Sequence, residues 1–148
     1  MPTSTTIPFE TTLLVRDTCL CLHAQRAARA LARRFDIALR PVGLTSGQFS
    51  LLMSLNRPKP ASIGSVAALL AMDRTTLTAN LKPLGRRGLL AVETDPADKR
   101  SRLLTLTDPG REVLIAAIPI WERTHEKIER GVAGLDVAGL RHALTSLA

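Results

Sequence analysis

Aromatic residues are almost absent from this chain. They make up 3% of its 148 residues, with one Trp and no Tyr, so a core must be built from Leu, Ala, Val and Ile. That composition favours close packing of helices. The only cysteines, Cys19 and Cys21, cannot make a disulfide framework. They lie two apart on a predicted helix and point to nearly opposite sides, which excludes a disulfide between them within one chain.

Long apolar runs are also missing. The longest, Val66–Met72 and Val113–Trp121, fall far short of the roughly 20 residues that a membrane-spanning helix needs. Residues 1–10 have neither a basic start nor an apolar stretch, so they do not predict a secretory signal. Residues 1–8 are rich in Thr, Ser and Pro and predict a loose arm. We therefore expect a protein without a membrane span, located in the cytoplasm.

The signatures of catalysis are missing as well. The chain has no phosphate loop, no paired histidines, no nucleophile motif and no acidic pair at useful spacing, so we expect neither an enzyme nor a cofactor. Cys19 and His23 are four apart on a predicted helix and could share a metal. Neither His125 nor His142 offers an evident third ligand, so no metal site is expected.

What the chain does have is an excess of positive charge. Its formal net charge of +7 favours a polyanionic partner, usually nucleic acid and less often an anionic membrane surface. Many soluble proteins are merely basic, so the placement of the charges must decide. The basic residues do not line one face of a single apolar-backed helix, which argues against a membrane-surface role. The length suits one compact protomer.

Helices are predicted at both ends of the chain. Residues 11–40 carry an apolar stripe at helical spacing and end before Pro41 and Gly43. A second long helix begins near Pro109 and reaches about Arg130, with a kink expected at Pro119. A last helix follows Asp136. Several of their apolar residues would be costly on a monomer surface, which predicts pairing with a second copy: Leu114, Ile115, Ile118, Trp121, Leu140 and Leu144.

The middle of the chain predicts a different unit. Thr45 and Gln48 have capping-box spacing at the start of a helix over 46–55. A short helix over 63–71 follows, and Asp73 can cap the next one, which begins at Arg74 and is closed by Gly88. Alternating apolar residues then predict two strands around 90–92 and 104–106, joined by a charged tip over 95–102.

Two helices followed by a basic hairpin are the plan of a winged helix-turn-helix. In that plan the amino end of the second helix meets base edges, where Arg and Asn can read guanine and adenine. Leu77, Leu81 and Leu84 face inward, so the polar residues of this helix face outward. Asp95 and Asp98 are expected to orient the cations of the tip. The candidate DNA contacts are Arg74, Thr75, Thr76, Thr78, Asn80, Lys82 and Arg86 on the helix, and Lys99, Arg100 and Arg102 on the wing.

The sequence resembles the MarR family of bacterial transcription regulators. The specific combination is the wing Asp95-Pro-Ala-Asp-Lys-Arg100 followed by Leu106-Thr107 and Gly110, supported by Val66–Leu70 and Gly88–Leu90. The resemblance covers about residues 13–147. It implies a mainly α fold with a small β-hairpin wing, in which residues 45–107 form the winged helix-turn-helix lobe and about 11–40 and 109–148 form dimerisation helices.

The resemblance also implies how such a protein works. A homodimer would hold each lobe on one half-site of a palindromic operator on double-stranded DNA. A small ligand or oxidation would change the spacing of the two lobes and release the DNA, most often as a repressor. Pro83 and Gly85 depart from the family pattern, and Pro83 removes the hydrogen bond to the carbonyl of Ala79. We therefore expect base contacts over 74–78 and phosphate contacts further along.

Two features bear on what would release the DNA. Cys21 lies 22 residues before Gly43, as the reactive cysteine does in the peroxide sensors of this family, but Gln25 and Phe35 stand where those sensors have tyrosines. Cys21 is therefore either a small buried core residue or a redox sensor, with Cys19 as a second candidate. An effector pocket could be lined by Phe49, Met53 and Trp121, which could equally be plain core residues.

One competing function remains open. A winged-helix protein can bind a protein partner without specific DNA binding. Basic groups on both the recognition helix and the wing argue against this alternative.

Overall fold

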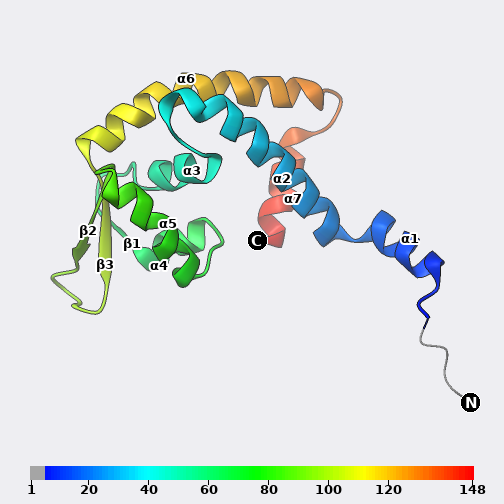
Figure 1. Ribbon diagram of the computed structural model, residues 1–148, viewed down its shortest axis with the longest axis horizontal. Coiled ribbons are helices and arrows are strands. Elements are labelled where there is room, and N and C mark those ends of the chain that lie inside the picture. The colour runs from blue at the N-terminus through cyan, green and yellow to red at the C-terminus, as the bar shows by residue number, and fades with distance from the viewer. Residues whose placement is uncertain (1–5) are drawn as a thin grey trace, which may run out of the picture.

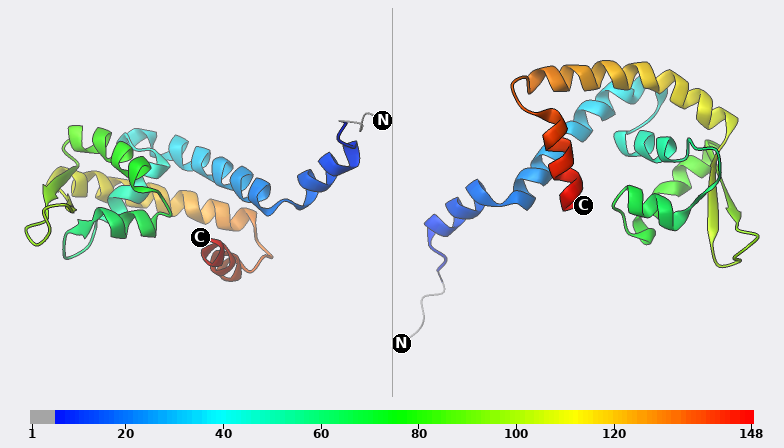
Figure 2. Two further views of the ribbon diagram at one scale, coloured as in Figure 1. Left: turned by 90° about the horizontal axis from the view of Figure 1, so that it is seen from below. Right: turned by 180° about the vertical axis from the view of Figure 1, so that it is seen from behind.

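The computed structural model describes residues 6–148 and consists mainly of helices, with one small sheet at one end of the molecule (Figure 1). The loose arm predicted over 1–8 lies largely outside these described residues. Two long helices, α2 (Leu20–Leu39) and α6 (Asp108–Gly131), run beside each other along one side of the molecule. The lobe containing α3–α5 and the sheet lies at one end of this pair (Figure 2).

The single helix predicted over 11–40 is wrong, because the chain forms two helices there. α1 (Phe9–Thr18) ends at Cys19, whose extended backbone separates it from α2. The Cys19 sulfur accepts a hydrogen bond from the backbone N–H of Leu22 at 3.4 Å and so caps α2. Cysteine is not among the residues that usually cap helices, so periodicity alone could not reveal this break. α1 extends away from the rest of the protomer (Figures 1 and 2).

The predicted helix caps of the lobe are confirmed. After the short 3-10 helix η1 (Arg40–Val42), Thr45 and Gln48 form the expected capping box at α3 (Ser46–Ser54). Asp73 caps α5 (Arg74–Arg86) as predicted, and Ser62, which was not predicted as a cap, caps α4 (Ile63–Leu69). Gly88 has φ = +71°, the left-handed conformation that a glycine adopts without strain after a helix.

The sheet has one strand more than the predicted hairpin. β2 (Leu90–Thr94) and β3 (Arg102–Leu106) pair antiparallel as expected, and β1 (Ala61–Ser62) pairs with the other edge of β3. Two residues are too few to show alternation in a sequence, so β1 was not predictable. It fixes the segment before α4 to the base of the wing.

The core joins the lobe to the long helices. Its largest fully buried side chains come from α2, α3, α4, α5 and β3: Leu39, Leu52, Val66, Leu77, Leu84 and Leu104. Leu114 and Ala117 of α6 complete it. The prediction that Leu114 lies on a pairing surface is wrong, because this side chain is only 3% exposed within its own protomer.

Most of the other apolar side chains predicted for this surface do lie there, whereas Trp121 is half-buried and packs against the core. Ile115 is 62% exposed, and Leu140 and Leu144 of α7 (Val137–Leu147) are 46% and 50% exposed. The predicted apolar stripe of α2 is buried only near its carboxyl end, and Leu20 and Leu31 are exposed. Arg141 of α7 donates a hydrogen bond to Glu129 of α6 at 2.8 Å, which lowers the pKa of that carboxyl.

No helix among residues 6–148 combines the length and the apolar character that crossing a membrane would require.

Candidate nucleic-acid interface

The recognition helix α5 has one buried face and one exposed face, as predicted. Leu77, Leu81 and Leu84 are buried at helical spacing and hold α5 on the lobe. This leaves the predicted contact residues of the helix on the exposed face: Arg74, Thr75, Thr76, Thr78, Asn80, Lys82 and Arg86. α5 continues through Pro83, so the missing hydrogen bond does not end the helix.

Asp73 organises the first turn of α5. Its Oδ1 accepts a hydrogen bond from the backbone N–H of Thr76 at 2.7 Å, and its Oδ2 accepts one from the Thr76 hydroxyl at 2.8 Å. These two bonds lower the pKa of the Asp73 carboxyl, because they stabilise its charged form. The carboxylate therefore fixes the turn that holds the predicted base-reading residues.

Replacing Asp73 with alanine should destabilise the protein in a pH-dependent way. The folded-state pKa is depressed, so the carboxylate contributes fully above the unfolded value of about 3.9. It contributes less as the pH falls through the folded pKa. We expect Asp73→Ala to lower the melting temperature near neutral pH and to lower it by less near about pH 3. A melting-temperature difference that does not change with pH would contradict the charged cap.

The polar side chains of α5 differ in whether they are already hydrogen-bonded within the chain. The Thr78 hydroxyl donates to the carbonyl of Arg74 at 2.8 Å, and the Asn80 amide lies 3.9 Å from the sulfur of Met72. Within the described chain, four side chains of α5 have no hydrogen bond or ion pair: Arg74, Thr75, Lys82 and Arg86. They are therefore the groups of α5 most available to a partner.

The position of Arg74 depends on a glycine in the preceding helix. Its guanidinium lies over Gly64 of α4, where an added Cβ would come within 3.0 Å of Nη2. Gly64 thus leaves room for the arginine at the junction of the two helices of the helix-turn-helix. Sequence reasoning did not identify this role, because the two residues are ten apart and meet only in the folded lobe.

The charged tip of the wing is ordered by its acidic residues, but not as predicted. Asp95 Oδ1 accepts from the backbone N–H of Ala97 at 2.9 Å, and Asp98 Oδ1 accepts from that of Arg100 at 3.0 Å. The expectation that these carboxylates orient the cationic side chains is wrong, since they bind the backbone instead. Across residues 6–148, the side chains of Lys99 and Arg100 have no hydrogen bond or ion pair.

Arg102 is not at the tip, where it was predicted. It is the first residue of β3, and its guanidinium donates to the carbonyls of Lys99 and Ser101 at 3.2 and 3.3 Å. It also lines an open groove of about 450 Å³ between α5 and the sheet. Thr78, Lys82 and Arg86 line the same groove, so the fold brings four of the predicted contacts together. Val92 is 48% exposed because it too lies in this groove.

A further arginine holds the carboxyl end of α5. Arg87 donates from Nη1 to the carbonyl of Gly43 at 2.8 Å, and thereby ties the recognition helix to the turn between η1 and α3. Arg87 is therefore engaged with its own chain.

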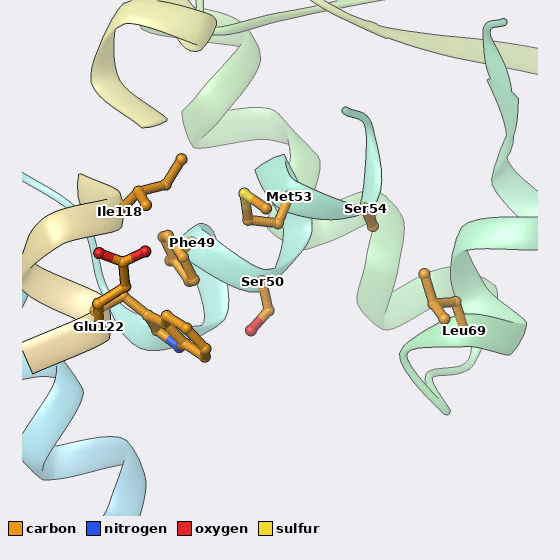
Figure 3. Close-up of a pocket in the computed structure, with 8 residues that line it drawn as sticks. Phe49, Ser50, Met53, Ser54, Leu69, Ile118 and Glu122 are labelled. Carbon is orange, nitrogen blue, oxygen red and sulfur yellow. The ribbon is translucent and has the colours of Figure 1, made fainter. Parts of the chain in front are cut away.

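The predicted effector residues meet in one open pocket of about 520 Å³ (Figure 3). Phe49 and Met53 come from α3 and Trp121 from α6. The rings of Phe49 and Trp121 are stacked with their centroids 6.2 Å apart, and His125 stacks on Trp121 at 4.8 Å. Sequence reasoning missed the remaining lining residues, because α3, α4 and α6 meet only in the tertiary structure: Ser50, Ser54, Leu69, Ile118 and Glu122.

The two cysteines lie near the break between α1 and α2. Cys21 is exposed, so the reading of it as a buried core residue is wrong for the protomer. Its sulfur accepts a hydrogen bond from the side-chain amide of Gln25 at 3.2 Å, and Arg29 donates to that amide's oxygen at 3.3 Å. His23 Nδ1 lies 2.8 Å from the backbone oxygen of Cys19, and residues 6–148 contain no cluster of three potential metal ligands.

A capped recognition helix, a preceding short helix and a basic β-hairpin together define a winged helix-turn-helix protein. The sequence model of the MarR family matches residues 44–101, which contain the recognition helix and the wing up to the start of β3. The MosR transcriptional regulator of Mycobacterium tuberculosis, in a complex with DNA, is 35% identical with a TM-score of 0.76. That likeness covers 88% of this chain and 98% of MosR. The chain belongs to the MarR family.

Two curated relatives support this assignment. The transcriptional activatory protein BadR of Rhodopseudomonas palustris is 40% identical over 97 residues, which are 64% of this chain and 55% of BadR. The transcriptional regulator HosA of Escherichia coli O111:H- is 33% identical over 92 residues, which are 62% of this chain and 67% of HosA. The chain thus matches little more than half the length of BadR.

Proposed function

We propose that the protein is a sequence-specific DNA-binding transcription regulator, without enzymatic activity, that acts as a homodimeric repressor on a palindromic operator. The observation that carries the proposal is the set of unpaired cations on α5 and on the wing. Arg74 and Lys82 on α5, and Lys99 and Arg100 on the wing, have no partner within residues 6–148. Ten residues are the proposed DNA contacts: Arg74, Thr75, Thr76, Thr78, Asn80, Lys82, Arg86, Lys99, Arg100 and Arg102.

The contacts divide by position. The amino end of α5 enters the major groove, so Arg74 and Thr75 meet base edges. The phosphates of one DNA strand lie along the groove between α5 and the sheet. Three cations line this groove: Lys82, Arg86 and Arg102. Lys99 and Arg100 contact the minor groove or its phosphates. The relative MosR has been seen in a complex with DNA, which supports the same use of this lobe.

Dimerisation is supported by the terminal helices. Exposed apolar side chains on α1, α6 and α7 include Leu14, Ile115, Leu140 and Leu144, which is more apolar surface than a monomer favours. A twofold axis through these helices would set the distance between two lobes and hence between two half-sites.

The release of DNA has two candidate triggers. A small ligand would occupy the pocket formed by Phe49, Met53 and Trp121. Oxidation would act at the exposed Cys21, whose sulfur accepts from Gln25, with Cys19 as the second cysteine.

Replacing Arg74 with alanine should relax sequence preference. The lost bidentate contact is worth about 1–3 kcal/mol of discrimination between the right and the wrong base. Affinity for the operator should therefore fall much more than affinity for random DNA, as measured by competition binding with both DNAs at one salt concentration. If both affinities fell by the same factor, Arg74 would be a phosphate contact instead.

The test of the proposed function is binding of the purified protein to its own upstream intergenic DNA across a salt series, with and without peroxide. Tight, salt-sensitive and sequence-selective binding is expected. Reversible loss with peroxide that Cys21→Ser abolishes would assign the trigger to Cys21, and binding indifferent to oxidant would leave the ligand as trigger. Weak binding that is equal on all sequences would overturn the proposal in favour of a winged-helix protein-interaction module.

A further inference from the structure

The pocket between α3 and α6 carries a single formal charge, and that charge is negative. Most of the surface of the pocket is apolar, from Phe49, Met53, Leu69, Ile118 and Trp121. Among residues 6–148, the only ionisable side chain that lines it belongs to Glu122. Figure 3 shows Glu122 on α6 and Ser50 on α3, on opposite sides of the Phe49 side chain. No lysine, arginine or histidine lines this pocket.

Two polar side chains of the pocket, Glu122 and Ser50, are free to bind a ligand, whereas the Ser54 hydroxyl donates to the carbonyl of Leu51. Within residues 6–148, the Glu122 carboxylate has neither a hydrogen bond nor an ion pair, and the Ser50 hydroxyl has no partner. The neighbouring acidic residues of α6 differ in this respect, because Glu126 pairs with Arg130 and Glu129 with Arg141. Glu122 is therefore the acidic group of this stretch that remains available.

The aromatic side chains of the pocket favour a cation, as the Glu122 carboxylate does. The face of an indole or phenyl ring is electronegative and attracts a cation that lies above it. The rings of Trp121 and Phe49, whose centroids lie 6.2 Å apart, line the pocket together with Glu122. An anionic ligand would meet repulsion from Glu122 and no compensating cation in the lining.

We propose that this pocket takes an apolar organic cation, such as an aryl-alkyl amine, as the ligand of the protein. Its aromatic part would lie among Phe49, Met53 and Trp121, and its ammonium group would lie beside the Glu122 carboxylate. A volume of about 520 Å³ is in the range of small-molecule sites. The inference rests on the proposed function, since it names the chemical class of the effector for the same pocket.

The sole tryptophan of the chain makes the test direct. Because Trp121 lines the pocket, any change in intrinsic fluorescence reports on this site. Three probes of one shape and different charge are titrated at neutral pH: 4-phenylbutylamine, 4-phenylbutanol and 4-phenylbutyrate. We expect the amine to bind about 10-fold more tightly than the carboxylate, with the alcohol in between.

Two variants assign the effect to Glu122. Glu122→Gln keeps the shape and removes the charge, so it should weaken amine binding about 10-fold and leave the alcohol unchanged. Glu126→Gln removes the same charge one turn further along α6, outside the pocket, and should alter none of the three affinities. Equal binding of amine and carboxylate, no binding of any probe, or amine binding that survives Glu122→Gln would each overturn the inference.

Operator binding is measured on the same preparations. Saturating amine should weaken it in the parent protein and less so in Glu122→Gln. Specific DNA binding together with a pocket that shows no charge preference would overturn the inference and keep the proposed function. A pocket selective for amines in a protein without specific DNA binding would overturn the proposed function and keep the ligand class.

Discussion

Gly110→Ala is expected to destabilise the protein by roughly 3 kcal/mol or more. Gly110 is buried at the start of α6, where the backbone after α5 crosses it. An added Cβ would overlap the carbonyl oxygen of Leu89 and would lie 2.9 Å from Leu106 Cδ1. The overlap involves backbone, so no side chain can rotate away to relieve it. The melting temperature, measured at one protein concentration, should fall by roughly 10 °C.

The hydrogen bonds around Gly110 explain why a small shift of α6 cannot relieve the overlap. Thr107 caps α6 by accepting from Gly110 N–H at 3.1 Å, and its hydroxyl donates to the carbonyl of Gly88 at 2.6 Å. The Thr107 N–H also bonds the carbonyl of Leu89 at 3.3 Å. Any shift of α6 that makes room for a methyl group would break these bonds between the lobe and the long helix.

Gly131→Ala is the matched control for this prediction. Gly131 is the last residue of the same helix, is exposed, and has no atom within 4 Å of an added Cβ. Its substitution should leave the melting temperature unchanged or slightly raise it, because alanine favours the helix. Equal stability of the two variants would mean that α6 does not meet the lobe as closely as the structure has it.

Removing both unpaired cations of the wing should cause the largest loss of DNA affinity. In Lys99→Ala/Arg100→Ala a homodimer would lose four positive charges that we place against phosphates. The slope of log affinity against log salt should become shallower by up to about 3.6, since each neutralised phosphate contributes about 0.9. At moderate salt we expect operator binding to weaken roughly 100-fold or more, and random DNA to be affected similarly.

The control variant for the wing removes the same amount of positive charge from a surface outside the lobe. Arg123 and Lys127 are exposed on α6, outside the lobe, so Arg123→Ala/Lys127→Ala lowers the net charge by the same amount. Its salt slope should stay close to that of the parent protein. If the two double variants behaved alike, total charge rather than the wing would determine DNA binding, and the wing assignment would be wrong.

Local features of the chain could be predicted from the sequence because their causes are local. Thr45 with Gln48, Asp73 and Gly88 cap helices through bonds that span a few residues, and the structure has each of them. The buried spacing of Leu77 and its neighbours on α5 is equally a property of one helix. The wing motif after this helix was enough to indicate the MarR family.

Features that depend on residues far apart in the sequence could not be predicted. β1 is too short to have a pattern and exists because β3 offers it an edge. Leu114 and Ile115 are neighbours of similar hydrophobicity, yet only Leu114 is buried, because the lobe packs on one side of α6. The break at Cys19 depends on an uncommon cap, and its neighbour Cys21 proved exposed.

The sequence by itself determined the class of fold, the position of the recognition helix and wing, and the family. Periodicity, caps and a contiguous motif act over one element, so they can be read along the chain. Only the tertiary structure decided which polar groups are free, since Asp95 and Asp98 bind backbone amides and leave Lys99 and Arg100 unpaired. It also placed Glu122 beside Trp121 and Phe49 in one pocket, because α3 and α6 meet only when the core forms.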